Sequence, residues 1–230
     1  MSIPIFSHPL SVLRFPLSVF RVLPLLSYSL PQHHGHGSRS YSLLPQSAID
    51  NAKRTNKIIT LRHKDPQKTM AQIGLISDTH DNLNMVKAAV QKFNQFDLAL
   101  VVHCGDYIAP FTLENFKEVK VKLLGVFGNC DGEREGLRKK AEALGFNLHI
   151  PPHKFELDGK KILVSHHPIA PTPGIDILIY GHTHQAEIRE GNPLIVNPGE
   201  ASGWLTGKAT IGILDTITLK VQIIQLWSYI

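Results

Sequence analysis

The sequence has few cysteines and no long apolar run, and both absences exclude classes of protein. Cys104 and Cys130 are the only cysteines in 230 residues, which rules out a disulfide framework and a Cys-x-x-Cys metal site. A reducing compartment is the simplest environment for such a chain. No apolar stretch approaches the roughly 20 residues that a membrane helix needs, so we expect no membrane span.

Acidic residues are missing from the start of the chain. The first 49 residues contain no Asp or Glu, but three Arg, six Pro and ten Ser. This composition resembles an organellar transit peptide. An equally simple interpretation is that residues 1–69 are a disordered basic leader upstream of a true start at Met70. We expect a globular domain over residues 70–230, located in the cytoplasm, or in an organelle if the leader is a genuine transit peptide.

The net charge of +5 is unevenly distributed. Residues 1–70 carry nine Lys/Arg against two Asp/Glu, a balance of +7, whereas residues 71–230 carry fifteen against seventeen, a balance of −2. The basic character therefore belongs to the leader. A slightly acidic body lacks the surface expected for long nucleic acid, so we expect no such partner.

Apolar periodicity predicts an α/β first half. Buried strands are expected at residues 73–77, 98–102 and 122–127, with helices at 83–93, 110–119 and 133–144 between and after them. Asn82 can cap the first helix, and Gly145 can end the third. Strand-helix alternation of this kind favours a parallel sheet with helices packed on it.

The second half is rich in strands. Asp158-Gly159 is typical of a hairpin turn between strands at 155–157 and 161–165. Further strands are expected at residues 175–180, 186–189, 194–196, 210–214 and 219–226. The fold class is therefore α/β, with two sheets packed together inside helical layers.

Seven side chains of metal-binding type occur in a fixed order: Asp78, His80, Asp106, Asn129, His166, His182 and His184. In open α/β sheets, functional groups collect where strands end. Extended backbone would aim residues 78 and 80 to one side, and likewise residues 182 and 184. Gly105, Gly128 and Gly181 precede ligands and would let the backbone turn closely around an ion.

This ligand set predicts a chemistry. Four imidazoles, two carboxylates and one amide suit Mn, Ni, Co, Fe or Zn better than Mg alone. Two such ions about 3.5–4 Å apart can bind a phosphate between them and activate a water as a hydroxide for in-line attack. We expect two divalent metal ions per chain, manganese first among them, and an enzyme that hydrolyses phosphate esters.

Residues 72–215 resemble the calcineurin-like metallophosphoesterase superfamily, especially its small bacterial and archaeal phosphodiesterases of the YfcE type. The matching segments are Ser77-Asp78-Thr79-His80-Asp81-Asn82, His103-Cys104-Gly105-Asp106, Gly128-Asn129-Cys130-Asp131-Gly132, Gly181-His182-Thr183-His184 and Asn197-Pro198-Gly199-Glu200. The resemblance implies a four-layer α/β/β/α sandwich of two packed sheets flanked by helices. It also implies a dinuclear phosphodiesterase acting on small phosphodiester substrates.

The resemblance further implies how the ligands divide. One metal would be held by Asp78, His80, Asp106 and His184, and the other by Asp106, Asn129, His166 and His182. Asp106 would bridge the two ions, and Asn129 would also touch the substrate phosphate. Both are therefore catalytic candidates.

Two positions depart from the family pattern. Cys130 stands where many relatives have a histidine that protonates the leaving group, and Ser165-His166-His167-Pro168 replaces a His-Gly-His segment. His166 is assigned as the ligand by position, with His167 as its rival. His167 and His103 are candidate proton donors, although His103 fits a core histidine better. Both cysteines are expected to be small buried packing residues.

A scaffold and a nuclease are the alternative functions. A non-catalytic scaffold, like the retromer subunit of the same fold, would be expected to have lost ligands, and a nuclease would need a basic surface. The exposed-looking Trp204 and Leu205, together with residues 227–230, could form an interface, or they could pack in the core or at an edge without a partner. The short segment between His166 and His182 is expected to be a loop. The sequence leaves open the physiological substrate and whether the chain forms a homo-oligomer.

Overall fold

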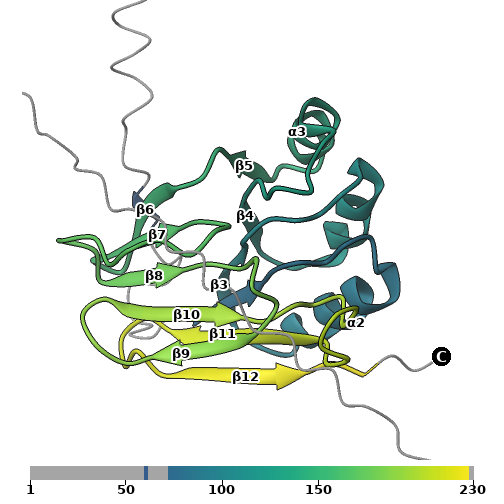
Figure 1. The fold of residues 1–230 in the computed structure, drawn as a ribbon. Coiled ribbons are helices and arrows are strands. Elements are labelled where there is room, and N and C mark those ends of the chain that lie inside the picture. Colours follow the sequence, from purple (N-terminus) through teal and green to yellow (C-terminus); the bar gives the residue numbers. More distant parts are fainter. Residues whose placement is uncertain (1–59, 62–71, 228–230) are drawn as a thin grey trace, which may run out of the picture. The chain divides into compact units, whose positions relative to one another are not determined.

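Two six-stranded sheets form the framework of the part of the chain that the structure describes (Figure 1). The structure, a computed structural model, describes residues 60–61 and 72–227. Apart from residues 60–61, the expected basic leader of residues 1–69 therefore lies outside the described residues. The first sheet has the order β12-β11-β2-β3-β4-β5, and the second has the order β1-β6-β7-β8-β10-β9. In the part that the structure describes, no helix is both long and apolar enough to cross a membrane.

The first sheet is parallel at its centre. Its strands are β12 (Val221–Gln225), β11 (Thr210–Asp215), β2 (Gln72–Ile76), β3 (Leu98–His103), β4 (Lys122–Val126) and β5 (Asn147–His149). Strands β2 to β5 are parallel neighbours, whereas β11 is antiparallel to both β2 and β12. The carboxyl ends of β2, β3 and β4 therefore meet at one edge of the sheet.

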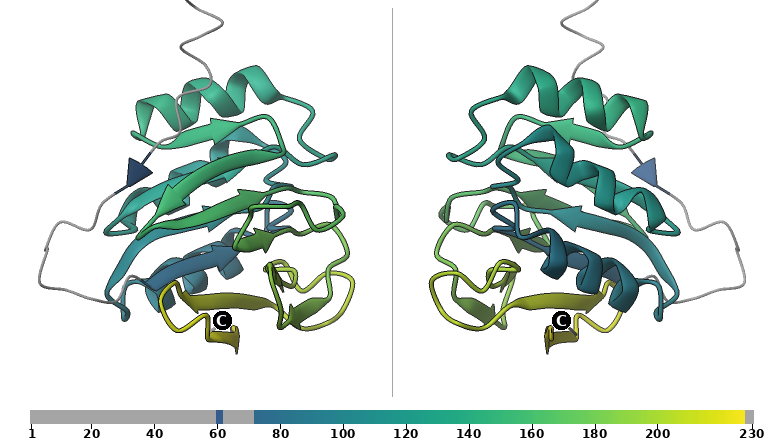
Figure 2. Two further views of the ribbon diagram at one scale, coloured as in Figure 1. Left: turned by 90° about the vertical axis from the view of Figure 1, so that its left-hand side faces the viewer. Right: turned by 90° about the vertical axis from the view of Figure 1, so that its right-hand side faces the viewer.

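Three helical segments cover the outer face of this sheet (Figure 2, right). They are α2 (Leu83–Phe93), the 3-10 helix η1 (Pro110–Glu118) and α3 (Arg134–Ala143). The Asn82 side chain accepts a hydrogen bond from the Met85 N–H and caps α2, as predicted. Gly145, with φ of 73°, follows the end of α3.

The second sheet mixes a hairpin with parallel strands. Its strands are β1 (Thr60–Leu61), β6 (His153–Leu157), β7 (Lys160–Val164), β8 (Ile177–Ile179), β10 (Leu194–Pro198) and β9 (Ala186–Arg189). The predicted turn between β6 and β7 is present, with φ of 50° at Asp158 and 75° at Gly159. Strands β7, β8 and β10 are parallel, so their carboxyl ends also share one edge.

The predicted α/β fold of two packed sheets with helices is confirmed. All helices among the described residues lie between residues 83 and 143 and pack on the first sheet. On the outer face of the second sheet a small apolar cluster includes Leu163, Leu178 and Ile195, and Ile169 from an irregular segment packs against it. The segment between His166 and His182, predicted to be a loop, is irregular up to β8. It occupies the position on the second sheet where the expected four-layer sandwich would have its second layer of helices.

The core between the sheets follows from the two-residue period of the strands. Ile73 and Leu75 of β2 point into the apolar cluster that also contains Ile162 and Val164 of β7. Cys104 is buried in this core, as predicted. Gly74, between the two inward residues, faces the helices instead.

Gly74 lets α2 approach the sheet closely. A Cβ at this position would lie 2.7 Å from Cε1 of Phe93, a fully packed side chain of α2. Replacement by alanine therefore forces the helix or the phenylalanine to shift.

We predict that Gly74→Ala lowers the free energy of unfolding by about 1–3 kcal/mol, because overpacking strains a well-packed core. Urea unfolding followed by circular dichroism measures the change. Gly132→Ala is the matched control, since no atom lies within 4 Å of a Cβ placed there. Equal unfolding midpoints for the two variants would show that α2 is not closely packed on β2.

Candidate metal centre

The seven predicted ligands lie together where the two sheets meet at the carboxyl ends of their strands. Asp78 and His80 follow β2, Asp106 follows β3, Asn129 follows β4, His166 follows β7, and His182 and His184 follow β8. A hydrogen-bond distance of 2.8 Å from His166 Nδ1 to the Cys104 carbonyl oxygen connects the end of β7 to the end of β3. Each sheet therefore contributes part of one site.

Most of these seven residues have a left-handed backbone conformation, which directs their side chains into the site. The φ angles are 52° at Asp78, 40° at His80, 60° at Asp106, 66° at His182 and 61° at His184. Residues other than glycine rarely adopt this region, and such residues cluster at functional sites. The prediction that extended backbone orients residues 78 and 80, and likewise residues 182 and 184, was wrong, because left-handed turns place these side chains in the site.

Glycines allow these turns to approach each other, as predicted. A Cβ on Gly128 would overlap Oδ1 of Asp106, and a Cβ on Gly181 would overlap Oγ of Ser77 and lie 2.8 Å from Oδ2 of Asp78. Any larger residue at either position would displace a carboxylate of the site.

Asp78, His80 and His184 form one group of converging ligand atoms. Asp78 Oδ1 lies 3.9 Å from His80 Nε2 and 3.6 Å from His184 Nε2. His80 Nε2 is buried and has no hydrogen-bond partner within the described residues. A buried lone pair with no donor normally costs free energy, so this geometry fits a cation as the absent partner.

His166 and Asn129 form a second group with Asp106. A carbonyl can only accept, so the contact of His166 Nδ1 with Cys104 places the ring proton on Nδ1 and turns Nε2 toward the site. Nε2 then lies 2.7 Å from Asn129 Oδ1 and 3.4 Å from Asp106 Oδ2. Three acceptor atoms this close need positive charge between them, from a second ring proton or a metal ion.

Asp106 lies between the two groups. Its Oδ2 is 3.6 Å from His80 Nε2 and 3.4 Å from His166 Nε2, while Oδ1 accepts a hydrogen bond of 2.8 Å from the Cys130 N–H. Burial alone would raise the pKa of Asp106, but hydrogen bonds from the doubly protonated His166 ring and from Cys130 outweigh it and hold the pKa well below its ordinary value. Asp106 is therefore an ionised carboxylate placed to contact two cations.

His182 and His167 complete the second side of the site. The His182 ring lies 5.1 Å from the His166 ring and 4.1 Å from the His167 ring, and each of the three contributes a nitrogen to one possible ligand cluster. His167 is exposed, whereas His166 is buried. The burial and fixed tautomer of His166 favour it as the ligand, and His167 remains the candidate proton donor.

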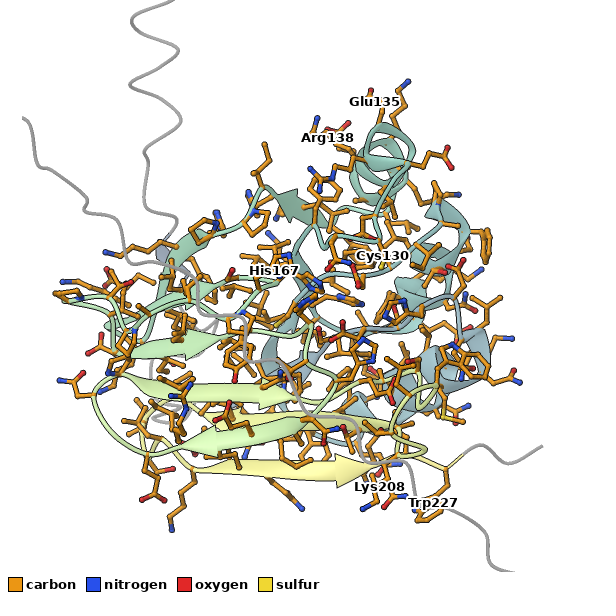
Figure 3. All side chains as sticks on the ribbon, in the orientation of Figure 1. Cys130, Glu135, Arg138, His167, Lys208 and Trp227 are labelled. Carbon is orange, nitrogen blue, oxygen red and sulfur yellow. The ribbon has the colours of Figure 1, made fainter. Side chains whose placement is uncertain are left out.

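The other predicted residues separate into interior and exposed positions. His103 is buried, stacks on Tyr107 at 3.8 Å, and has both ring nitrogens within hydrogen-bond distance of Gly105 and Thr79. Burial lowers its pKa well below the ordinary value, which supports a core histidine. The prediction that Cys130 is buried was wrong, since it is exposed on the turn that follows Asn129 (Figure 3).

Glu200 is a site residue that sequence reasoning missed. Its Oε2 lies 2.9 Å from His184 Nδ1, which directs Nε2 of that ring toward Asp78. Burial would raise the pKa of Glu200, but hydrogen bonds from Thr206, His184 and Ser202 lower it to about 2. Glu200 belongs to a segment that matches the family pattern, yet a single Glu after a strand gave no sign of a contact with His184.

Asp131 was also given no role by the sequence, although it organises the Asp106 turn. Its carboxylate accepts hydrogen bonds from the backbone N–H groups of Asp106, Tyr107, Ile108 and Gly128, at 3.1, 2.7, 2.9 and 2.7 Å. Asp131 therefore holds the turns after β3 and β4 in a fixed relation.

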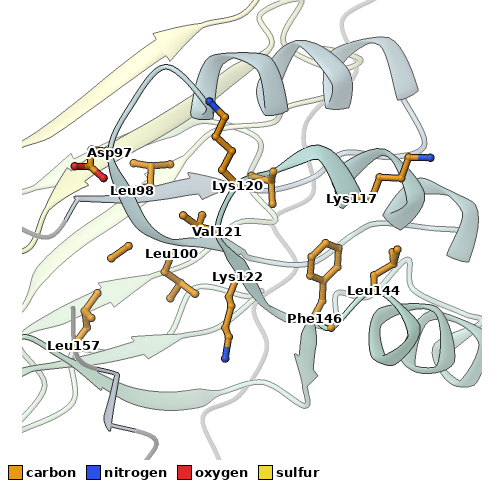
Figure 4. Close-up of a pocket in the computed structure, with 13 residues that line it drawn as sticks. Asp97, Leu98, Leu100, Lys117, Lys120, Val121, Lys122, Leu144, Phe146 and Leu157 are labelled. Carbon is orange, nitrogen blue, oxygen red and sulfur yellow. The ribbon is translucent and has the colours of Figure 1, made fainter. Parts of the chain in front are cut away.

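A cavity of about 640 Å³ lies elsewhere, beside the amino ends of β3 and β4 (Figure 4). Leu98, Leu100 and Phe146 line it together with the stems of Lys120 and Lys122. Because the ligands occupy the carboxyl ends of the same strands, this cavity is at the opposite edge of the sheet and is not part of the metal centre.

The fold and the nitrogen and oxygen ligands together define a metallophosphoesterase. Residues 71–218 match the calcineurin-like phosphoesterase superfamily domain, and the chain belongs to this family of hydrolases that act on phosphate esters.

Individual relatives agree with this class. The chain is 36% identical over 154 residues to a phosphodiesterase of Methanocaldococcus jannaschii, a match that covers 63% of this chain and 93% of the relative. It is 29% identical over 174 residues to the phosphodiesterase YfcE of Escherichia coli, covering 66% and 91% of the two chains. The solved structure of an archaeal phosphodiesterase superimposes with a TM-score of 0.63 at 34% identity, covering 67% of this chain and 99% of that one. The predicted resemblance is confirmed.

We predict that Glu200→Gln lowers the affinity for divalent metal about 10- to 100-fold, because the carboxylate orients His184 and raises its basicity. Competition with a metal-binding dye measures the affinity. Glu190→Gln, at an exposed position, is the control.

The same variant also tests the pKa of Glu200, which is depressed from 4.5 to about 2. A depressed pKa contributes stability above the unfolded value of 4.5 and loses it as pH falls toward 2. The stability difference between wild type and Glu200→Gln should therefore shrink over this interval. A difference independent of pH would contradict the assignment.

Proposed function

We propose that the chain is a phosphodiesterase that hydrolyses small phosphodiesters at a centre of two divalent metal ions. The position of Asp106 between two imidazole groups carries this proposal, since one carboxylate oxygen lies 3.6 Å from His80 Nε2 and 3.4 Å from His166 Nε2. The first ion would be held by Asp78, His80, Asp106 and His184, and the second by Asp106, Asn129, His166 and His182. Bound ions supply the charge that binds a phosphate and lowers the pKa of a water molecule.

The nature of the ligands supports the choice of metal. Imidazole nitrogens suit first-row transition metals, whereas Mg²⁺ keeps an all-oxygen shell. We place manganese first, with nickel, cobalt, iron and zinc as alternatives.

Contact with the substrate phosphate and protonation of the leaving oxygen fall to side chains beside the two metal sites. The Asn129 amide, beside His166, is placed to contact the substrate phosphate. His167 is exposed next to His182 and is placed to give a proton to the leaving oxygen. Partial desolvation of the thiol and the nearby Asp106 raise the pKa of Cys130 to about 11, which makes the thiol a poor proton donor at neutral pH.

Small substrates fit the charge of the domain. Residues 71–230 have a net charge of −2, so the domain lacks the excess of positive charge that favours binding of long nucleic acid. The convergence of the seven candidate ligand side chains at one site argues against a non-catalytic scaffold. His166 and His184 also have hydrogen-bond partners that fix their rings.

The first test is metal removal and replacement. We expect chelator-treated protein to hydrolyse neither bis(p-nitrophenyl) phosphate nor p-nitrophenyl phosphate, and Mn or Ni to restore activity toward the diester. Asp106→Asn should lower the restored rate by at least about a hundredfold, because it removes the charge shared by both ions. Two bound metal equivalents without diester hydrolysis, for every metal tried, would support a scaffold instead.

The roles of the adjacent histidines can be separated. His166→Ala should abolish metal-dependent activity and lower metal affinity, because His166 is the buried ligand. His167→Ala should lower the rate by about 10²- to 10⁴-fold, the usual contribution of a general acid, with metal affinity unchanged. The defect should be smaller with p-nitrophenolate, which leaves readily without a proton, than with an alkoxide leaving group. The reverse order of effects on metal affinity would exchange the two roles.

A further inference from the structure

The turn after Glu200 places two large apolar side chains in solvent. Trp204 is 64% exposed and Leu205 is 76% exposed, so neither packs in the interior. Burying a side chain of this size normally contributes stability, and an exposed tryptophan held at a functional site needs another reason.

Hydrogen bonds attach this turn directly to the metal ligands. The Trp204 Nε1–H donates to the carbonyl oxygen of His80 at 3.2 Å, and the Ser202 N–H donates to the carbonyl oxygen of Asp78 at 3.1 Å. The indole is therefore held by one edge beside the first ligand group, with most of the ring surface left open.

Glu200 holds the same turn in place. Its carboxylate accepts hydrogen bonds from the Leu205 N–H at 3.0 Å and from Thr206 Oγ1 at 2.7 Å, while it also contacts His184. Gly203 and Gly207, with φ of 69° and 71°, allow the tight backbone path. One buried carboxylate thus positions a ligand and the exposed tryptophan together, and little conformational entropy is left to lose when the ring binds something.

We propose that Trp204 determines substrate specificity by stacking on a planar ring of the phosphodiester, such as a nucleobase or an aryl group. This inference rests on the proposed phosphodiesterase activity and names the substrate class of the same site. A planar ring matches the flat exposed indole, and stacking on an aromatic side chain is tolerant of which base is bound. Leu205, on the same turn, adds an apolar neighbour.

A purely structural role for Trp204, or a role in self-association, predicts different results. If the indole only supports the strained turn at His80, its loss should impair metal binding and all substrates alike. If it contacts a second copy of the chain, its loss should change the molar mass in solution and not the affinity for small molecules.

The kinetic test compares Trp204→Ala with Trp204→Phe. We expect Trp204→Ala to raise KM for bis(p-nitrophenyl) phosphate and Ki for adenosine 5′-monophosphate roughly tenfold or more. The Ki for ribose 5-phosphate, which has no planar ring, should not change. Trp204→Phe keeps a ring but loses the hydrogen bond, so it should retain most of the affinity for the ring-bearing ligand.

Trp227 provides the matched control. It follows the end of β12, is 66% exposed and is the only other tryptophan in the chain (Figure 3). Trp227→Ala should leave both Ki values unchanged.

A binding measurement needs no turnover. Trp227→Phe leaves Trp204 as the single tryptophan, and adenosine 5′-monophosphate should quench its fluorescence with a Kd equal to the measured Ki. Ribose 5-phosphate should not quench it. Equal quenching by both ligands, quenching by neither, or equal Ki values for wild type and Trp204→Ala would overturn the inference while wild-type diester hydrolysis persists. A wild-type protein that hydrolyses no diester with any metal would overturn the proposed function and this inference with it.

Discussion

The concentration of buried charge around Asp78 and Asp106 is the constraint on which the site depends. Asp78 is fully buried, and burial raises its pKa, whereas hydrogen bonds keep Asp106 ionised. Isolated buried carboxylates cost several kcal/mol each, so positive charge must be supplied nearby. The imidazoles of His80, His166 and His184 provide lone pairs rather than fixed charge when they are neutral. The arrangement is therefore most stable with cations among the ligands.

The left-handed backbone conformations at the carboxyl ends of the strands cost conformational free energy, and neighbouring groups stabilise them. A left-handed residue other than glycine costs about 1–3 kcal/mol, and persists only when its surroundings determine it. Asp131 does so for the Asp106 turn through four backbone N–H groups. Glu200 also holds the turn that carries Trp204, although the left-handed residues of that turn are the glycines Gly203 and Gly207. These two carboxylates are not among the candidate metal ligands, yet they hold the backbone and the His184 ring that position those ligands.

Features that follow from repeating sequence patterns could be predicted, whereas features that depend on single contacts between distant residues could not. Apolar periodicity located the helices and most of the strands on either side of Asp158-Gly159, and the Asn82 cap was correct. The seven candidate ligands could be named because each follows a strand whose carboxyl end reaches one edge. The short strands β1 and β5 have no such period. The roles of Glu200 and Asp131, and the exposure of Cys130, depend on contacts between distant segments that spacing along the chain does not show.

The division of the ligands between the sheets has a thermodynamic consequence. Asp78, His80, Asp106 and Asn129 come from the first sheet, whereas His166, His182 and His184 come from the second. An ion bound between them is bound only when the sheets are docked, so occupancy and folding are linked equilibria. A metal present at a hundred times its Kd would add about 2.7 kcal/mol to the folded state. Metal binding would therefore stabilise the docked pair of sheets in addition to completing the site.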